Sequence, residues 1–133
     1  MTEFVIDLVN RPGSLAKVTE LLADAGVNVE TLAAWGADGD AVVRLIVDHA
    51  DAARRALDAA GLRTTEHTVL TARLPHRPGA LAELTRALAD AAVNIDAMYV
   101  LRSHEHEIEV ALAVDQPDTA DDRLQVLGGV TLT

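Results

Sequence analysis

A chain of 133 residues, 50% of them hydrophobic, is long enough for one ordinary domain or two very small ones. A formal net charge of −10 and three aromatic residues disfavour nucleic-acid binding, because acidic surfaces repel phosphate and exposed bases stack on aromatic rings. The sequence has no cysteine for disulfides or thiolate metal sites, and its acidic start and short apolar runs predict a cytoplasmic protein without signal peptide or membrane span.

The first half of the chain alternates between the periodicities of strands and helices. Phe4, Ile6 and Leu8 alternate with their neighbours as in a strand, and after a turn at 11–13 the apolar residues recur at helical spacing. The elements expected in chain order are a strand to Val9, a helix ending at Gly26, extended segments over 27–35 and 41–47 around a hairpin turn at 36–39, a second helix from Asp48 or Ala50 to Gly61, and a strand region from Thr64 to Leu74.

The second half repeats the first. Residues 77–94 match residues 11–28 at twelve of 18 positions, at a fixed offset of 66 residues. Matches farther along the chain have an offset of 67, so we expect one inserted residue in a turn near Gly39 or His104. The last two elements expected in the second copy are a helix over 118–126 and a strand over 130–132.

Each copy has the order strand, helix, strand, strand, helix, strand. This order predicts an α+β fold of the ferredoxin-like βαββαβ type, with one antiparallel sheet and both helices on one of its faces. Two copies are too few for a solenoid, so we expect two such units in tandem, with domains at residues 1–67 and 68–133.

The motifs around the first helix of each copy resemble those of the ACT domain, a small-ligand regulatory module of amino-acid metabolism. In the first copy the resemblance lies in NRPGSLA over 10–16 and AGVNV over 25–29; in the second it lies in HRPGAL over 76–81 and AVNI over 92–95. The resemblance extends over essentially the whole chain and implies a stand-alone tandem ACT protein. It also implies that an amino acid binds at domain interfaces, near the first strand–helix loop and the start of the second strand.

The chemistry of these motifs is compatible with such a ligand. A helix that starts after a glycine turn offers backbone N–H groups and the positive end of its dipole to one carboxylate. Asparagine carbonyls at the start of the second strand can accept hydrogen bonds from an ammonium group. Either motif is also explained as a plain turn or a plain strand start. The candidate ligand-binding residues are Asn10, Arg11, Pro12, Gly13, Ser14, Gly26, Val27, Asn28, His76, Gly79, Ala80 and Asn94.

The two copies differ at three of the motif positions. Asn10, Ser14 and Gly26 of the first copy are replaced by a histidine and two alanines in the second. The alanine at position 92 costs roughly 1 kcal/mol if the left-handed turn is kept. The first copy therefore keeps the fuller pattern and is the expected ligand site, while the second is structural or binds something different through His76.

The sequence contains few candidates for metal binding or catalysis. His104 and His106 would share one face of a strand, a spacing that can chelate a metal, but no third ligand accompanies them. Neither serine lies in a nucleophile-elbow motif, and there is no phosphate-binding loop. We therefore expect no enzyme activity, no cofactor and no metal site.

The outer faces of the predicted sheets carry apolar and charged residues. Val and Ile on the outer face of a one-sided sheet imply a partner surface. The three glutamates at 105, 107 and 109 would repel one another unless an arginine faces them, and the candidate arginines are Arg44, Arg73 and Arg102.

Three hypotheses for the function follow. The leading hypothesis is a non-catalytic regulatory module that binds a small amino acid and acts on a regulated enzyme or forms a homodimer. The alternative is an ACT-fold subunit that serves protein association alone and binds no ligand. A small enzyme using the His104–His106 edge is a third hypothesis.

Overall fold

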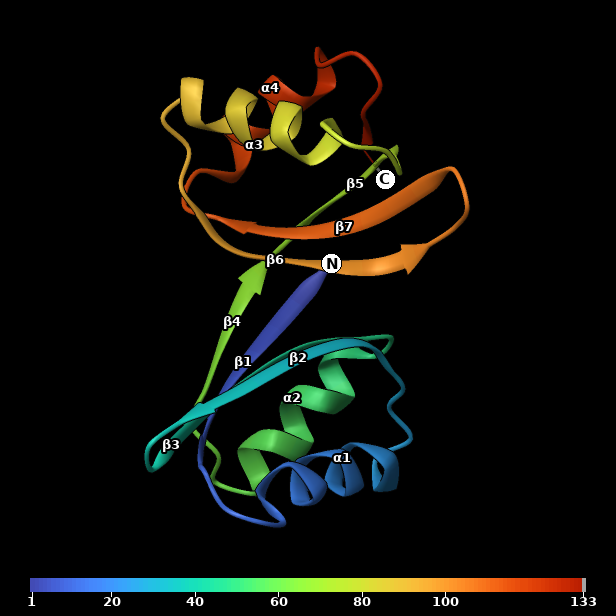
Figure 1. Ribbon diagram of the computed structural model, residues 1–133. Helices are drawn as coiled ribbons and strands as arrows, with labels where there is room; N and C mark the ends of the chain where they lie inside the picture. Colours follow the sequence, from blue (N-terminus) through green and yellow to red (C-terminus); the bar gives the residue numbers. More distant parts are fainter. Residues whose placement is uncertain (133) are drawn as a thin grey trace. The chain divides into compact units, whose positions relative to one another are not determined.

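The computed structural model describes residues 1–132, which divide into two compact units. The first unit is Thr2–His67, and the second begins at Thr68 and includes Met1. Each unit has the order βαββαβ and contains one four-stranded antiparallel sheet (Figure 1). This is the α+β, ferredoxin-like fold that the order of periodicities predicts. Within residues 1–132, no helix is both long enough and apolar enough to cross a membrane.

The first unit has its strands in the order β2-β3-β1-β4. Strand β1 pairs antiparallel with β3, which pairs antiparallel with β2, so β2 and β4 form the two edges of the sheet. The elements of this unit are β1 (Thr2–Val9), α1 (Ser14–Asp24), β2 (Val29–Ala37), β3 (Asp40–Val47), α2 (Ala50–Ala59) and β4 (Thr64–Thr68).

The second unit has the same topology, with the strand order β6-β7-β5-β8. Its last helix and strand lie within one residue of the expected ends, although residue 133 lies outside the described residues. The elements of this unit are β5 (Leu70–Pro75), α3 (Ala80–Asp90), β6 (Ile95–Ser103), β7 (Glu107–Val114), α4 (Pro117–Gln125) and β8 (Thr131–Leu132).

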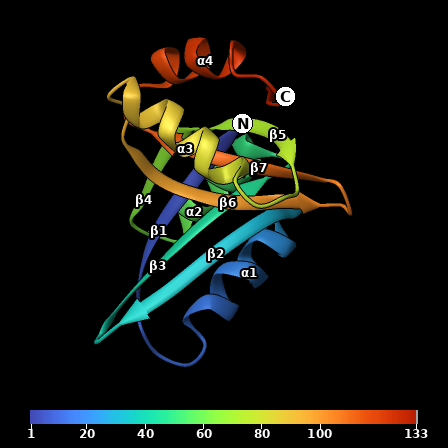
Figure 2. The same cartoon turned by 45° about the horizontal axis from the view of Figure 1, so that its top comes forward.

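Each unit has its own hydrophobic core between the sheet and its two helices. In the first unit, Phe4 and Ile6 of β1 pack with Leu45 of β3, Leu22 of α1 and Leu57 of α2, and all five are essentially fully buried. The period of two along the strands and the helical spacing of the leucines therefore place the apolar residues on facing surfaces. In the second unit, α3 and α4 lie on the same side of the sheet (Figures 1 and 2).

The two β-hairpins account for the change of offset between the copies. Residues 38–39 connect β2 to β3, and residues 104–106 connect β6 to β7. The β6–β7 register shifts between Val100 and Arg102, where the β2–β3 register has no equivalent shift, so the extra residue lies in strand β6 and not in the turn. The structure corrects two further expectations here. Gly36 belongs to strand β2 and not to the turn, and His104 and His106 belong to the turn and not to one face of a strand.

The turn that follows the first helix has the same left-handed conformation in both copies. Gly26 has a φ of 71°, and Ala92, its counterpart, has a φ of 58°. Both turns close with the same hydrogen bond, from Val27 N–H to the Leu22 carbonyl and from Val93 N–H to the Leu88 carbonyl, each 2.9 Å long. The second copy therefore keeps the turn in spite of the alanine, at a conformational cost of about 1 kcal/mol.

Candidate functional site

The loop between β1 and α1 is held in place by backbone contacts at both ends. The N–H of Asn10 donates to the carbonyl of Gly39 in the β2–β3 turn, at 2.9 Å. Gly13 has a φ of 88°, a conformation that glycine adopts without the steric cost of a Cβ, and α1 begins at the next residue. The motif thus places Asn10, Arg11 and Ser14 around the N-terminus of α1, between this helix and the β2–β3 hairpin.

A cavity of about 190 Å³ lies beside this loop. Asn10, Arg11 and Ser14 line it from the loop and the start of α1, and Trp35 and Gly36 line it from β2. The structure therefore brings together three of the residues that the sequence motif singles out. It also adds two residues that the motif does not contain, because β2 reaches the loop only through its pairing with β3.

The side chain of Asn10 is positioned by Gly36. Its amide nitrogen donates to the carbonyl of Asp38, at 3.2 Å. A Cβ at position 36 would lie 2.6 Å from the amide atoms of Asn10, so the side chain occupies the space that only a glycine leaves there. A glycine within a strand is the sequence signal for such a close approach.

The cavity combines groups of different chemistry. The amide nitrogen of Asn10 is used by Asp38, which leaves its carbonyl oxygen as a hydrogen-bond acceptor. Within residues 1–132, the guanidinium of Arg11 forms no ion pair. The indole of Trp35, 53% exposed, supplies an apolar wall. One carboxylate, one ammonium and a small apolar group therefore find suitable partners here.

The second motif of the first copy lies at the other end of α1. This helix has 11 residues, and a rise of 1.5 Å per residue separates its ends by about 16 Å. Gly26 and Asn28 follow the C-terminal end, where the backbone N–H of Asn28 donates to Asp48 Oδ1 at 2.9 Å, and Val27 is buried in the core. Within one unit, the structure therefore does not bring the two motifs to one ligand.

In the second copy, the second motif is likewise held by hydrogen bonds within the chain. The backbone N–H of Asn94 donates to Asp115 Oδ1 at 2.8 Å, and its side chain donates to Asp96 Oδ1 at 2.9 Å. At the loop before α3, Gly79 has a φ of 92°, as Gly13 has in the first copy. Asn94 therefore has intrachain partners for both its N–H and its side-chain amide.

The loop before α3 offers fewer free polar groups than the loop before α1. Ala80 is 4% exposed and has no hydroxyl, and Pro78 and His76 are exposed. The guanidinium of Arg77 lies 3.4 Å from the carboxylate of Glu83 and also donates to the Pro78 carbonyl at 3.2 Å. The arginine of the second loop is thus neutralised within the chain, unlike Arg11.

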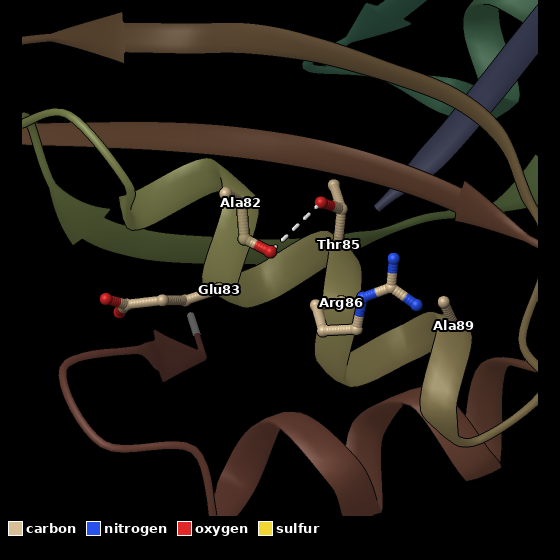
Figure 3. A pocket seen from close by; sticks show the side chains of 5 residues that line it. All are labelled: Ala82, Glu83, Thr85, Arg86 and Ala89. Atoms are coloured by element: carbon tan, nitrogen blue, oxygen red, sulfur yellow. Dashed lines mark hydrogen bonds between the residues drawn. The ribbon is translucent and has the colours of Figure 1, made fainter.

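A larger hollow, of about 630 Å³, lies along α3. Its lining comes from one helix, and the side chains of Glu83 and Arg86 extend toward opposite ends of it (Figure 3). The hydroxyl of Thr85 donates to the Ala82 carbonyl at 3.3 Å, so it is engaged with the helix backbone. This surface has no converging polar groups from a second element among the described residues, which makes it a weaker candidate than the cavity at Asn10.

The histidines do not form a metal site in the described residues. Within residues 1–132, no group of three or more His, Asp or Glu side chains is placed to hold a metal ion. His106 approaches Glu105 at 3.9 Å, and both side chains are almost fully exposed in the turn. The hypothesis of an enzyme that uses His104 and His106 on one face of a strand lacks the strand on which it depends.

Of the three candidate arginines, only Arg102 forms an ion pair with one of the three glutamates, within residues 1–132. Glu105 lies in the turn before β7 and not on its face. Arg102 lies 3.0 Å from Glu109 in the second unit, and Arg44 lies 2.9 Å from Glu3 in the first. Arg73 is the cross-strand neighbour of Glu109 in the β5–β7 register. Charge repulsion along β7 is therefore reduced inside the chain, by arginines on neighbouring strands.

Comparison with known proteins identifies one family. The sequence model of the ACT domain matches residues 2–59 and 68–126, once for each unit. Among solved structures, protein BT0572 from Bacteroides thetaiotaomicron is similar to this chain with a TM-score of 0.88 and 27% identity, over 99% of this chain and 90% of that one. No curated protein matches the sequence.

Regulatory subunits of aspartate kinase share the fold. The subunit from Thermus thermophilus, in its ligand-free form, has a TM-score of 0.71 and 20% identity over 93% of this chain and 87% of that chain. The subunit from Thermus flavus has a TM-score of 0.66, also with 20% identity, over 95% and 88% of the two chains. The tandem arrangement of two βαββαβ units is therefore found in regulatory subunits as well.

Proposed function

Because the chain belongs to the ACT domain family, we propose that it is a non-catalytic regulatory protein whose first unit binds a small amino acid. The ligand occupies the cavity of about 190 Å³ beside the β1–α1 loop. The observation that carries this proposal is the convergence of Asn10, Arg11 and Ser14 of the family motif with Trp35 on one cavity of suitable size.

The chemistry of the cavity supports an amino acid over other small molecules. The α-carboxylate of the amino acid binds Arg11 and the N–H groups at the start of α1, which carry the positive end of the helix dipole. Its ammonium donates to the carbonyl oxygen of Asn10, and its side chain packs on Trp35. A volume of about 190 Å³ favours a small amino acid.

The motif at Gly26, Val27 and Asn28 is the second part of the proposed site. It lies about 16 Å from the loop of its own unit, across the length of α1. A ligand that contacts both motifs therefore requires the β2 start of another ACT unit beside the loop. This is the interface part of the site that the family resemblance implies, and we retain it as part of the proposal.

The alternative function is protein association without a ligand. The observation that favours it is the apolar character of edge strand β2, where Leu32 and Trp35 are 36% and 53% exposed. An exposed edge strand with large apolar side chains is suited to contact with another protein, either a second copy or a regulated enzyme. The two functions differ in whether an amino acid stabilises the fold.

A thermal-shift screen against the twenty amino acids separates the two functions. A ligand that binds only the folded state stabilises it by about 2.7 kcal/mol at a concentration of 100 times its Kd, which raises the Tm by several degrees. We expect at least one small amino acid to raise the Tm. If none does, while the protein forms stable oligomers, association is the function and the amino-acid proposal is wrong.

Titration calorimetry with the amino acid found in the screen then locates the site. Replacing Asn10 by Ala removes a hydrogen bond to a charged group, worth about 1.5–3 kcal/mol, which weakens binding by about tenfold or more. The matched control is His76→Ala, the same change at the equivalent position of the second copy, which leaves the affinity unchanged. Equal losses in both variants would place a ligand in each copy.

A further inference from the structure

A second cavity, of about 240 Å³, adjoins the first and shares Leu8, Val9, Arg11 and Ser14 with it. It is bordered by Asp7 at the end of β1, by Lys17 on α1 and by residues 61–63 in the turn before β4. The N–H of Asp7 donates to the carbonyl of Arg63 at 3.1 Å, which holds this turn beside β1. Arg11 lines this cavity as well as the first one.

The charge of this cavity contrasts with that of the chain. Arg11, Lys17 and Arg63 line it together with a single acid, Asp7, although the whole chain carries a net charge of −10 with 11 basic residues. Within residues 1–132, none of these three cationic side chains forms an ion pair. The arginines that do pair with acids, elsewhere in the chain, are Arg44, Arg54, Arg77, Arg86 and Arg102.

The second copy carries different charges at the equivalent positions. Lys17 is matched by Glu83 at the offset of 66 residues, and Glu83 pairs with Arg77 at 3.4 Å. Asp7 is matched by Arg73, and Arg63, in the turn before the last strand, by the uncharged Val130. The internal repeat thus provides the same fold with and without the group of three unpaired cations, so the fold itself does not require them.

We propose that this cavity of the first unit is a second binding site, which takes a small molecule with two or more negative charges. Arginine forks and a lysine ammonium around one cavity bind a phosphate group or a pair of carboxylates through charge-assisted hydrogen bonds. A phosphate monoester and a dicarboxylate share this chemistry. Arg11 borders both cavities, whereas Lys17 and Arg63 border only this one.

Inorganic phosphate and succinate, as the two probes, test the site by thermal shift and titration calorimetry at constant ionic strength. We expect one of them to raise the Tm of the wild-type protein. Lys17→Glu introduces the residue of the second copy, which pairs with Arg11, and it weakens binding of that probe by at least about tenfold. Arg63→Val also introduces the residue of the second copy, and it is likewise expected to weaken binding of the probe.

The matched control is Arg55→Glu, which changes the net charge by the same amount on the exposed surface of α2, away from the cavity. It leaves probe binding unchanged if the cavity is the site. Equal weakening by Lys17→Glu and Arg55→Glu, or no response of the wild-type protein to either probe, overturns the proposal. Preference for phosphate or for succinate identifies the ligand class. Arg63 borders only this cavity, so amino-acid binding measured in Arg63→Val is expected to stay unchanged, which distinguishes a failure of this proposal from a failure of the first.

Discussion

At the scale of single residues, the position of the Asn10 side chain near α1 depends on the absence of a Cβ at Gly36. The amide of Asn10 lies over Gly36, and the two residues are brought together by the hydrogen bonds of the β2–β3 hairpin and by the contact of Asn10 with Gly39. In the second copy the corresponding residues are His76 and, by the pairing of the strands, Ser103. The two loops therefore present different polar groups although their backbones follow the same turn.

Gly36→Ala is expected to displace the Asn10 side chain with little effect on folding. The added Cβ would lie 2.6 Å from the amide of Asn10, at the end of a flexible side chain that can move away. The hydrogen bond from Asn10 to Asp38 is then lost, and the carbonyl oxygen of Asn10 no longer occupies its place as an acceptor in the cavity. Affinity for the amino acid falls by about tenfold in titration calorimetry. Gly39→Ala is the control, because its Cβ meets open space in the same hairpin. Unchanged affinity in Gly36→Ala would contradict a role of Asn10.

At the scale of elements, one ion-pair network connects helix α2 to edge strand β4. Arg54 on α2 donates from Nε to Glu66 Oε2 at 2.7 Å and from Nη1 to Asp51 Oδ1 at 2.7 Å. The hydrogen bond from Arg54 lowers the pKa of Glu66 below its usual value of 4.5. A lowered carboxyl pKa means that the folded protein holds the ionised form more strongly than the unfolded chain does.

The stability that Glu66 contributes is therefore present above pH 4.5 and is lost as the pH falls through its lowered pKa in the folded state. Glu66→Gln is expected to have a lower Tm than the wild type at pH 7, and the difference should vanish in strongly acidic solution. Melting curves across this pH range provide the measurement. Asp58→Asn, on the same helix, is the control and shows no such pH-dependent difference. A constant difference at all pH values would mean that the glutamate acts through packing.

At the scale of the whole molecule, the chain contains two separate hydrophobic cores. One consists of residues from β1, β3, α1 and α2, and the other of residues from β5, β7, α3 and α4. Leu22 of α1 and Leu88 of α3 occupy equivalent positions at the offset of 66 and are each fully buried in their own core. Separate cores are the physical basis for treating residues 1–67 and 68–133 as domains, a boundary that stays a prediction.

Truncating one core should destabilise one unit more than the other. Leu22→Ala and Leu88→Ala each cost about 2–5 kcal/mol through lost burial and the cavity left behind. The single tryptophan, Trp35, reports on the first unit alone. In urea, Leu22→Ala is expected to shift the fluorescence transition of Trp35 to lower concentration, whereas Leu88→Ala shifts an early phase of the circular dichroism and leaves the fluorescence transition in place. Equal fluorescence shifts in both variants would show that the units unfold together.

Much of the fold was predictable because its signals are local. The alternation of Phe4 and Ile6, the glycines at 13 and 26, and the repeated motif each indicate an element or its end from a few adjacent residues. The prediction at the second hairpin was wrong for the same reason. His104 and His106 have strand spacing, but β6 ends at Ser103 and β7 begins at Glu107, and the ends of two hairpin strands are determined by their pairing.

The sequence by itself determined the order of elements, the duplication, the membership in the ACT family and the core faces, because periodicity, turn residues and internal identity can be read along the chain. Only the tertiary structure decided which side chains share a cavity. The register of β2 on β3 brings Trp35 and Gly36 to Asn10, and the pairing of β4 with β1 brings Arg63 to Lys17. The tertiary structure also separates Asn10 from Asn28 by the length of α1. These distances depend on hydrogen bonds between strands far apart in sequence, so no single segment contains them.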